Sequence, residues 1–420
     1  MPLGFYIIMA AQFFSALADN ALLIAAIAVL QDIDAPAAYE PLLKTFFAIS
    51  YVALAAFVGA FADSMPKWRV MFISNAIKIL GCFMMFYGVH PLVAYAVVGI
   101  GAATYSPAKY GILTEYLPHR LLVVANGWLE GLTVGAVILG VVLGGMLTTQ
   151  GFADAVRALD FALLRTPSEA AIFMIGILYI VAAIFNFYVP DTGVDHKPLK
   201  KNPFFLVHEF NHCLGLLWKD RLGQISLAVT SLFWGASATL QFIVIHWAQT
   251  VLGFNLAKAT ELQGWVAAGV AFGAAMAARS ITLRGSVRVI PVGIALGVVV
   301  LVMNFIDRVS LAIPMLILIG GLGGFFVVPM NALLQHRGHV LMGAGHSIAV
   351  QNFNENLSIL VMTTLYYLMI EASLSIYTII TMFGFFLSVC MTLIRQVHLA
   401  NQRQYDHVAH LDDTRHGRGK

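Results

Sequence analysis

Apolar stretches long enough to cross a bilayer recur along this whole chain. A spanning helix needs about 20 largely apolar residues, and breaks at charged, proline and glycine clusters leave twelve such stretches. Of the 420 residues, 60% are hydrophobic and 11% are charged, against about 25% charged in ordinary soluble domains. The sequence therefore predicts an all-α polytopic membrane protein with twelve transmembrane helices. The expected spans are 5–30, 42–62, 69–89, 92–116, 121–149, 168–190, 222–251, 258–280, 286–306, 310–335, 341–370 and 374–399.

Two polar stretches interrupt the rhythm of the spans. One, 150–167, is expected to be a hairpin between two spans. The other, 191–221, divides the chain into two halves of six spans each. The expected domains are an N-terminal six-helix bundle (1–190) and a C-terminal six-helix bundle (222–400). Between them lies a cytoplasmic linker with an interfacial amphipathic helix (191–221), and a polar cytoplasmic tail follows (401–420).

The distribution of basic residues orients the spans, because cytoplasmic connections of membrane proteins carry an excess of Lys and Arg. One side of the predicted topology receives seventeen basic residues, including those of the linker and the tail. The other side receives only Lys44, Arg157, Arg165, Lys258 and Arg308. We therefore expect both termini to be cytoplasmic.

The two halves of the chain look related. "FFSALADNALLIAAIAV" in the first span can be laid on "LFWGASATLQFIVIHWA" in the seventh. In the fourth and tenth spans, Pro107 then corresponds to Pro329 and Lys109 to Asn331. Parallel repeats joined by a cytoplasmic linker suggest a rocking transporter with its site between the halves.

Two short motifs would, taken alone, indicate an enzyme. "HEFNH", residues 208–212, fits the H-E-x-x-H pattern of zinc peptidases, but such a site needs a third protein ligand, and the sequence offers no suitable one. "HVAHLD", residues 407–412, fits an acyltransferase pattern, yet the polar tail is too short to build that domain. We interpret both as chance matches and expect no metal and no cofactor.

The loop after the second span carries a family signal. "GAFADSMPKWR", residues 59–69, resembles the G-x-x-x-D-x-x-x-[RK] loop of the major facilitator superfamily, with Gly59, Asp63 and Lys67 in register. It departs from that pattern at Ser64 and Pro66. The resemblance implies a loop that latches the cytoplasmic gate through charged contacts. The alternative is that any short cytoplasmic loop carries basic residues.

Five charged residues fall inside predicted spans: Asp19, Lys78, Lys109, Glu130 and Glu355. An unpaired charge in the membrane is costly, so each of them is a candidate functional residue. In the superfamily fold, spans 1, 4, 7 and 10 line the central cavity. The resemblance therefore implies a substrate site formed by Asp19, Asn20, Tyr105, Lys109, Gln241 and Asn331. The alternative is a structural Asp19–Lys109 pair that only fixes helix packing. Lys78 is expected at the periphery, with a snorkelling side chain.

The remaining polar candidates fall on the seams between the halves, which spans 2, 5, 8 and 11 form in this fold. Glu130 shares a helix face with Asn126 and Thr133. Asn352 and Glu355 belong to the dense cluster "QNFNENLS". A latch between helices, a coupling-ion site and the rim of a lateral opening all remain open, and the latch is favoured.

Several stretches resemble the bacterial lysophospholipid transporters of the same superfamily over nearly the whole chain. They are "QFFSALADNALL", "YSPAKYGILTE", "VVANGWLE", "SLFWGASATLQF" and "VQNFNENLS". Asp19, Asn20, Lys109, Tyr110 and Glu115 match motif positions, and relatives with an arginine in place of Gln241 put the span 7 headgroup contact in doubt. The resemblance implies a flippase moving lysophosphatidylethanolamine and lysophosphatidylglycerol from the outer to the inner leaflet of the bacterial inner membrane.

The same resemblance implies which molecules the protein interacts with. The expected partners are the lysolipid, membrane lipids and a separate acyltransferase/acyl-carrier-protein synthetase on the cytoplasmic side. We expect a monomer, no nucleic acid and no ATP, since the chain has no G-x-x-x-x-G-K-[ST] loop. Two alternatives stay open: a proton-coupled drug or metabolite porter, with Asp19 or Glu130 carrying the proton, and a membrane-bound hydrolase or acyltransferase.

Overall fold

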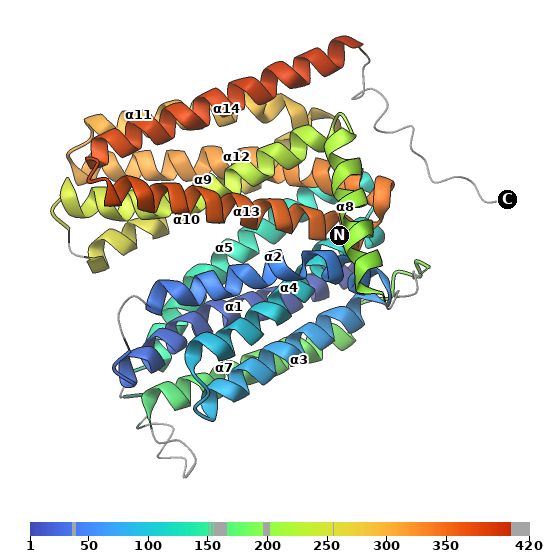
Figure 1. The fold of residues 1–420 in the computed structure, drawn as a ribbon, viewed down its shortest axis with the longest axis vertical. Coiled ribbons are helices and arrows are strands. Elements are labelled where there is room, and N and C mark those ends of the chain that lie inside the picture. The colour runs from blue at the N-terminus through green and yellow to red at the C-terminus, as the bar shows by residue number, and fades with distance from the viewer. Residues whose placement is uncertain are drawn as a thin grey trace. The chain divides into compact units, whose positions relative to one another are not determined.

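A computed structural model describes residues 1–35, 39–149, 151–152, 154, 166–195, 202–254 and 256–404. Within these residues the fold is all-α, as the sequence predicts (Figure 1). The long helices are α1 (Leu3–Asp32), α2 (Tyr39–Asp63), α3 (Lys67–Phe86), α4 (Pro91–Tyr116), α5 (Leu122–Leu147), α7 (Pro167–Phe187), α8 (Pro203–Lys219), α9 (Gly223–Thr250), α10 (Leu256–Ser280), α11 (Ile290–Val302), α12 (Val309–Met342), α13 (Ala344–Glu371) and α14 (Ile376–Gln404).

Each predicted span corresponds to one of these helices, and α8 falls in the linker. Across the described residues, ten helical stretches are long and apolar enough to cross a membrane. The two spans outside that set are α10 and α13. Both carry polar side chains within the helix, such as Gln263 in α10 and the amide cluster of α13. The chain is a multi-pass membrane protein; the count of twelve spans rests on ten such stretches and two more polar helices.

Local sequence signals explain several helix ends. Thr166 caps α7 by accepting a hydrogen bond from the Glu169 backbone N–H, and the Glu169 side chain bonds back to Thr166, which makes a capping box. Between α12 and α13, Gly343 has a φ of +95°. A glycine suits this backbone conformation, so one helix ends there and the next begins.

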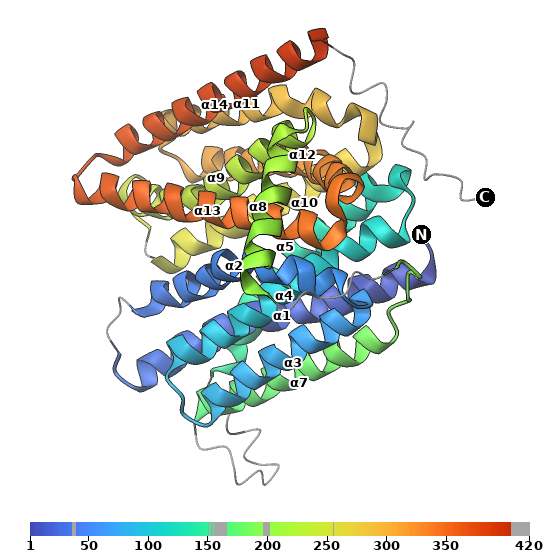
Figure 2. The same cartoon turned by 45° about the vertical axis from the view of Figure 1, so that its right-hand side comes forward.

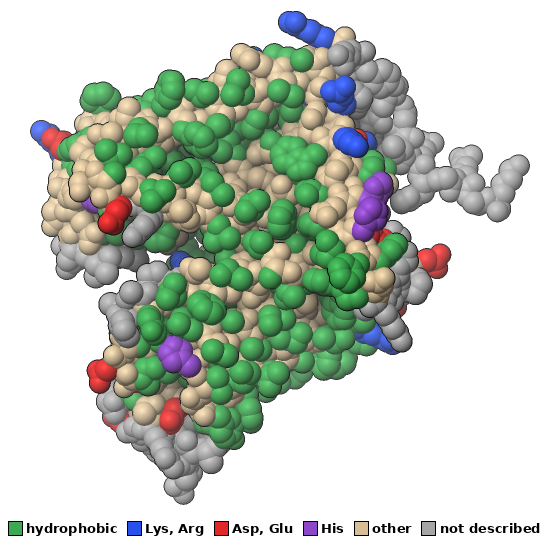
Figure 3. Space-filling model, viewed as in Figure 1, with side chains coloured by type: hydrophobic (Ala, Val, Ile, Leu, Met, Phe, Trp, Pro, Cys, Tyr) green, Lys and Arg blue, Asp and Glu red, His purple; other side chains and the backbone are tan. Residues whose placement is uncertain are grey.

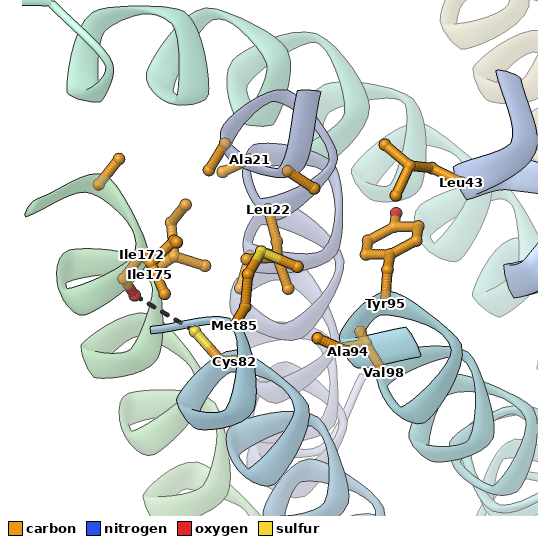
Figure 4. Close-up of a cluster of buried hydrophobic side chains, with 14 of the residues drawn as sticks. Ala21, Leu22, Leu43, Cys82, Met85, Ala94, Tyr95, Val98, Ile172 and Ile175 are labelled. Carbon is orange, nitrogen blue, oxygen red and sulfur yellow. Dashed lines mark hydrogen bonds between the residues drawn. The ribbon is translucent and has the colours of Figure 1, made fainter. Parts of the chain in front are cut away.

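Unit 1, the first of two compact units, comprises residues 1–116, 132–211 and 343–353. Within it α3 packs on α4 and α7, α2 on α4, and α1 on α7. An apolar core joins these helices through residues such as Leu22, Tyr95 and Ile175 (Figure 4). The Cys82 thiol lies in this core and donates a hydrogen bond to the Ile172 carbonyl at 3.2 Å. This unit is the scaffold for the ion pair described below.

Unit 2 comprises residues 117–131, 212–342 and 354–420. Its closest packing is between α10 and α12, where a Cβ added at Gly320 would lie 2.0 Å from the Val266 carbonyl oxygen. Small residues let helix backbones approach closely in a membrane. The division between the units falls inside α5, α8 and α13, and the four domains expected from the sequence stay a prediction.

The surface suits a lipid environment. Large apolar side chains such as Leu139, Phe272 and Phe385 are exposed. On the face drawn in Figure 3, hydrophobic side chains are spread over the helical surface, and charged side chains are sparse. In α8, Phe204 and Trp218 are exposed while Phe210 and Leu217 are buried, and its first part runs across the direction of α3 and α7 (Figure 2). Exposed aromatic residues on a short, half-polar helix fit a place in the headgroup layer.

Candidate functional site

A buried ion pair stands at the centre of unit 1. The Lys78 ammonium on α3 lies 2.7 Å from Oδ2 of Asp19 on α1. The Lys78 side chain is 2% exposed and that of Asp19 is 20% exposed. A charge inside a membrane bundle needs a partner of opposite charge, and here Lys78 and Asp19 are partners of each other. The Asp19 side chain thus stays partly exposed although both of its carboxylate oxygens accept hydrogen bonds.

Hydrogen bonds from other helices fix the pair. The Tyr179 hydroxyl on α7 donates to Oδ1 of Asp19 at 2.8 Å. The Lys78 ammonium also donates to the Ser15 hydroxyl at 3.0 Å, and Ser15 donates to Oδ1 of Asn75 at 2.9 Å. The Tyr105 ring of α4 faces the same ammonium, with its centroid 4.9 Å from Nζ. Four helices therefore hold Asp19 in one place.

The position of Lys78 corrects the expectation made from the sequence. Lys78 does not snorkel at the periphery; it is buried and forms the ion pair with Asp19. A glycine makes room for it, since a Cβ at Gly101 would lie 2.6 Å from Lys78 Cγ. A signal was present in the sequence, because Ser74, Asn75 and Lys78 form a polar stripe on one face of an otherwise apolar helix.

The other predicted substrate residues differ in their burial and in the groups they contact. The Asn20 amide donates to the Ala16 carbonyl of its own helix at 2.8 Å. Lys109 is half-buried, with its ammonium 4.7 Å from the centroid of the Tyr110 ring. Gln241 is exposed, and Asn331 is buried on α12. The structure thus brings Asp19 and Tyr105 together through Lys78, a residue outside the predicted set.

A second charged cluster lies at the turn between α2 and α3. The Lys67 ammonium is 2.9 Å from Oδ1 of Asp63 and 3.3 Å from Oε1 of Glu115 at the end of α4. Glu115 in turn accepts a hydrogen bond from the Thr192 hydroxyl at 2.9 Å. Asp63 and Lys67 of the loop that resembles the superfamily motif therefore contact each other, and Lys67 also contacts a second acid, Glu115.

The same cluster holds the first turn of α13, whose residues 343–353 belong to unit 1. Asp63 accepts hydrogen bonds from the backbone N–H groups of Gly345 at 2.8 Å and His346 at 3.2 Å. Its Oδ2 also lies 2.7 Å from Nδ1 of the His346 ring. A carboxylate at a helix N-terminus satisfies donors that have no partner within the helix and is stabilised by the helix dipole.

Close backbone approach accompanies these bonds. A Cβ added at Gly59 would lie 3.0 Å from the Cα of His346, and one at Gly345 would lie 2.5 Å from Oδ1 of Asp63. Glycine at both positions lets α2 and α13 come together.

The HEFNH stretch lies on α8 and takes part in this cluster. Oε2 of Glu209 is 3.9 Å from Nε2 of His346, while His208 and His212 are exposed. Across the described residues, no three His, Cys, Asp or Glu side chains form a group that could hold a metal ion. The glutamate of the motif thus faces a histidine of α13.

Polar pairs along α4, α5 and α13 include some that sequence reasoning missed. The Asn352 amide donates to the Ser106 hydroxyl at 2.9 Å, and Glu355 is buried on the same helix. In unit 2, Asn126 and Gln335 exchange two hydrogen bonds of 3.0 Å. The side chain of Glu130 lies outside the described residues.

A further missed pair closes the turn between α8 and α9 in unit 2. The Arg337 guanidinium binds Asp220 through two hydrogen bonds of 2.6 and 3.0 Å. Burial raises the pKa of the Asp220 carboxyl, but the hydrogen bonds and charge of Arg337 outweigh burial and hold that pKa below its usual 3.8. The two residues are 117 positions apart, so no local pattern could have paired them.

Comparison with known proteins decides the family. Residues 8–363 match the family model described as Major Facilitator Superfamily. The chain is 41% identical over 365 residues to a protein named lysophospholipid transporter LplT from Yersinia pestis (strain Pestoides F), covering 87% of this chain and 86% of that protein. The protein of that name from Yersinia pseudotuberculosis serotype I (strain IP32953) gives the same figures. The chain belongs to the lysophospholipid transporter family of the major facilitator superfamily.

Solved structures of superfamily members share the fold of this family member at low identity. The transporter FucP in the outward conformation has a TM-score of 0.71 at 14% identity, covering 95% of this chain and 98% of that one. A bacterial homologue of the iron transporter ferroportin, in an outward-facing state, has a TM-score of 0.71 at 13% identity, with 96% and 100% covered. The human organic anion transporter MFSD10 has a TM-score of 0.68 at 13% identity, with 95% and 99% covered.

Proposed function

We propose that this protein is a flippase that moves lysophospholipids, such as lysophosphatidylethanolamine and lysophosphatidylglycerol, from the outer to the inner leaflet by alternating access. The observation that carries the proposal is the 41% identity, over 365 residues, to proteins named lysophospholipid transporters. No catalytic step is proposed. A polar path must replace the hydration of the headgroup during flipping, because a charged group in hydrocarbon is costly.

The headgroup contacts follow from the chemistry of the buried charges. Asp19 carries a negative charge on a partly exposed side chain, with Lys78 and Tyr179 bound to its carboxylate, so it suits the ammonium of ethanolamine. Lys109, half-buried one turn beyond Tyr105, suits the phosphate, which every lysophospholipid carries. Asn20, Tyr105, Gln241 and Asn331 complete the proposed substrate-binding set.

The cytoplasmic gate is proposed at the cluster around Asp63. Lys67, Glu115 and the glycines at 59 and 345 allow Asp63 to hold the start of α13. Opening toward the cytoplasm would break these bonds and free the first turn of α13. Asn352, Glu355 and Glu130 are the proposed latch residues along the seams.

The cellular setting is also a proposal. The charge bias of the connections supports a bacterial inner membrane with both termini cytoplasmic. A separate acyltransferase/acyl-carrier-protein synthetase would consume the flipped lysolipid there, and this removal would give transport its direction without an ion gradient. The protein would act as a monomer. Inward flipping that collapses when a protonophore is added would contradict this part of the proposal and favour a proton-coupled porter.

The test is inward movement of labelled lysolipids in vesicles containing the purified protein. Lys109→Ala should lower transport of both the ethanolamine and the glycerol form about tenfold, a loss of ~1.4 kcal/mol of interaction. Asp19→Asn, combined with Lys78→Met so that no unpaired charge stays buried, should lower the ethanolamine form more than the glycerol form.

Arg308→Ala is the matched control, since the Arg308 side chain is 78% exposed. This substitution should leave the transport rates of both lysolipids unchanged. Failure of the well-folded wild type to move either lysolipid would overturn the proposed function. Transport by Lys109→Ala at the wild-type rate would overturn the phosphate contact alone.

A further inference from the structure

The His346 ring on α13 lies between two carboxylates in unit 1. Its Nδ1 atom is 2.7 Å from Oδ2 of Asp63 at the end of α2, and its Nε2 atom is 3.9 Å from Oε2 of Glu209 on α8. The His346 side chain is 6% exposed and that of Glu209 is 30% exposed. His208 and His212, also on α8, are exposed. Two acids from different helices therefore face the two nitrogens of one buried ring.

The geometry of these contacts favours a charged ring. A charged imidazole donates hydrogen bonds from both nitrogens, whereas a neutral one donates from a single nitrogen and carries a lone pair on the other. With a neutral ring, either Asp63 or Glu209 would face that lone pair. With a charged ring, both carboxylates are attracted to it.

Charges on the neighbouring helices act in the same direction. Lys67 at the start of α3 pairs with Asp63 at 2.9 Å and with Glu115 near the end of α4 at 3.3 Å. Together with Glu209, this gives three acids and one lysine in the cluster. A positive charge on His346 balances part of that excess, because charges at partly buried sites interact more strongly than they do in water.

An aromatic contact joins α8 and α13 at a second point. Phe210 of α8 packs edge-on against Phe353 of α13, with ring centroids 5.5 Å apart and an interplanar angle of 79°. Phe353 lies about two helical turns beyond His346, so the two residues share a face of α13. Glu209 and Phe210 are adjacent on α8. Helix α8 is therefore held to α13 by one contact that is independent of pH and by another that depends on the charge of His346.

We infer that His346 is a proton-sensitive link that makes α8, the helix of the linker, part of the proposed gate. With its ring charged, His346 joins Asp63 to Glu209 and holds α8 against the first turn of α13. Loss of the proton removes the attraction to Glu209 and weakens this attachment. Histidine usually changes charge between about pH 5 and about pH 8. The link should therefore be tight at the acidic end of that range and loose at the alkaline end.

Such a link gives the glutamate of the HEFNH stretch a role in regulating the protein. Its place at the gate rests on the proposed function, because the gate is part of that proposal. The link itself is a property of the folded chain, so it is tested without transport.

The test is hydrogen–deuterium exchange of the full-length protein in lipid nanodiscs at about pH 5.5 and about pH 8.5, corrected for the intrinsic effect of pH on exchange. Peptides of α8 and of the first turn of α13 should exchange about fivefold faster at the higher pH, because one charged contact is lost. His346→Gln keeps a polar side chain that cannot gain a charge, and should remove this dependence on pH in both segments.

Glu209→Gln is the second variant, at a side chain exposed enough for the fold to tolerate the change. It should reduce the effect of pH on α8 to less than about twofold, while Asp63 still holds the start of α13. His208→Gln is the matched control, because His208 is exposed on the same helix, and it should keep the wild-type dependence on pH.

Two results would overturn the inference. One is equal corrected exchange of wild-type α8 at the two pH values. The other is a dependence on pH that persists in both His346→Gln and Glu209→Gln. A wild type that shows the expected exchange pattern yet moves no lysolipid would support the link and count against the proposed function.

Discussion

The interiors of the two units are built in opposite ways. Unit 1 holds a buried lysine and aspartate, joined by hydrogen bonds from α1, α3 and α7. Unit 2 holds an apolar cavity lined by α9, α11, α12 and α14, with α10 at its side. The alignment that matches Pro107 with Pro329 also matches Gly101 with Gly323. The first glycine makes room for Lys78, and the second lies on the cavity wall.

This difference shows that two helical units of one chain can be stabilised in different ways. A buried charge pair specifies one geometry, because either charge alone is costly in the membrane. An apolar cavity specifies size and little else. The predictions below test whether the contrast holds in stability and local motion.

The largest expected effect is on the ion pair. Lys78→Met should lower the free energy of unfolding by about 3–5 kcal/mol, since it leaves Asp19 buried without its partner. The double variant Asp19→Asn/Lys78→Met should regain most of that loss. Unfolding titrations in mild detergent measure both, with exposed Arg308→Met as the control. A Lys78→Met variant as stable as wild type would show that the ion pair does not stabilise unit 1.

The next effect belongs to the Asp220–Arg337 pair of unit 2. Arg337→Gln should lower the free energy of unfolding by about 1–2 kcal/mol at neutral pH, allowing for solvent screening at this partly exposed site. Because the folded pKa of Asp220 lies below the unfolded one, its contribution is full above the usual 3.8 and is lost as pH falls through the folded pKa.

The measurement is the stability difference between wild type and Arg337→Gln across pH. We expect a constant difference from about pH 8 to about pH 5 and a shrinking one below about pH 4. A difference that already shrinks near neutral pH would show that this pair is not held by the Asp220 carboxylate.

The next effects compare the two units at the aligned glycines, Gly101 of unit 1 and Gly323 of unit 2. Gly101→Ala should destabilise by about 1–2 kcal/mol, because its Cβ would meet Lys78 Cγ at 2.6 Å and the Ser74 carbonyl oxygen at 2.7 Å. Gly323→Ala should cost less than about 1 kcal/mol, because its Cβ meets the Phe233 ring, which can move into the cavity. Thermal unfolding of both variants tests this, and equal losses would contradict it.

The smallest effect concerns the end of unit 1 that contains Asp63. Asp63→Asn should weaken the bonds to the Gly345 and His346 amides by about 1 kcal/mol. Hydrogen–deuterium exchange at the start of α13 should then speed up about fivefold, while exchange in α11 of unit 2 should stay unchanged. Unaltered exchange at Gly345 and His346 would argue against a latch at this point.

Much of the fold could be predicted from sequence because membrane insertion is a local constraint. Each spanning helix must satisfy its own backbone hydrogen bonds, so length and hydropathy place most of the spans to within a few residues. The exceptions are α12 and α14, which continue to Met342 and Gln404, beyond the predicted ends at 335 and 399. The cluster of Asp63 and Lys67 was also predictable, because both residues lie on one short turn. Gly343 marks the break between α12 and α13, which the sequence predicts near the same place.

Partners distant in sequence were not predictable in this way. Lys78 was expected at the periphery, because a lone lysine in an apolar helix more often snorkels; only the packing of α1, α3 and α7 shows that it is buried beside Asp19. The pairs Asp220–Arg337 and Asn126–Gln335 likewise join positions far apart in the chain. Glu209 lies in a motif that suggested a metal, but its neighbour is His346.

By itself, the sequence determined that this chain is helical and crosses a membrane many times, because hydropathy and helix length act one segment at a time. The tertiary structure alone decided which charge meets which, and that unit 1 buries an ion pair while unit 2 has an apolar cavity. Those features depend on side chains brought together from different helices, and a shift of one helical turn in any of them would change the partners.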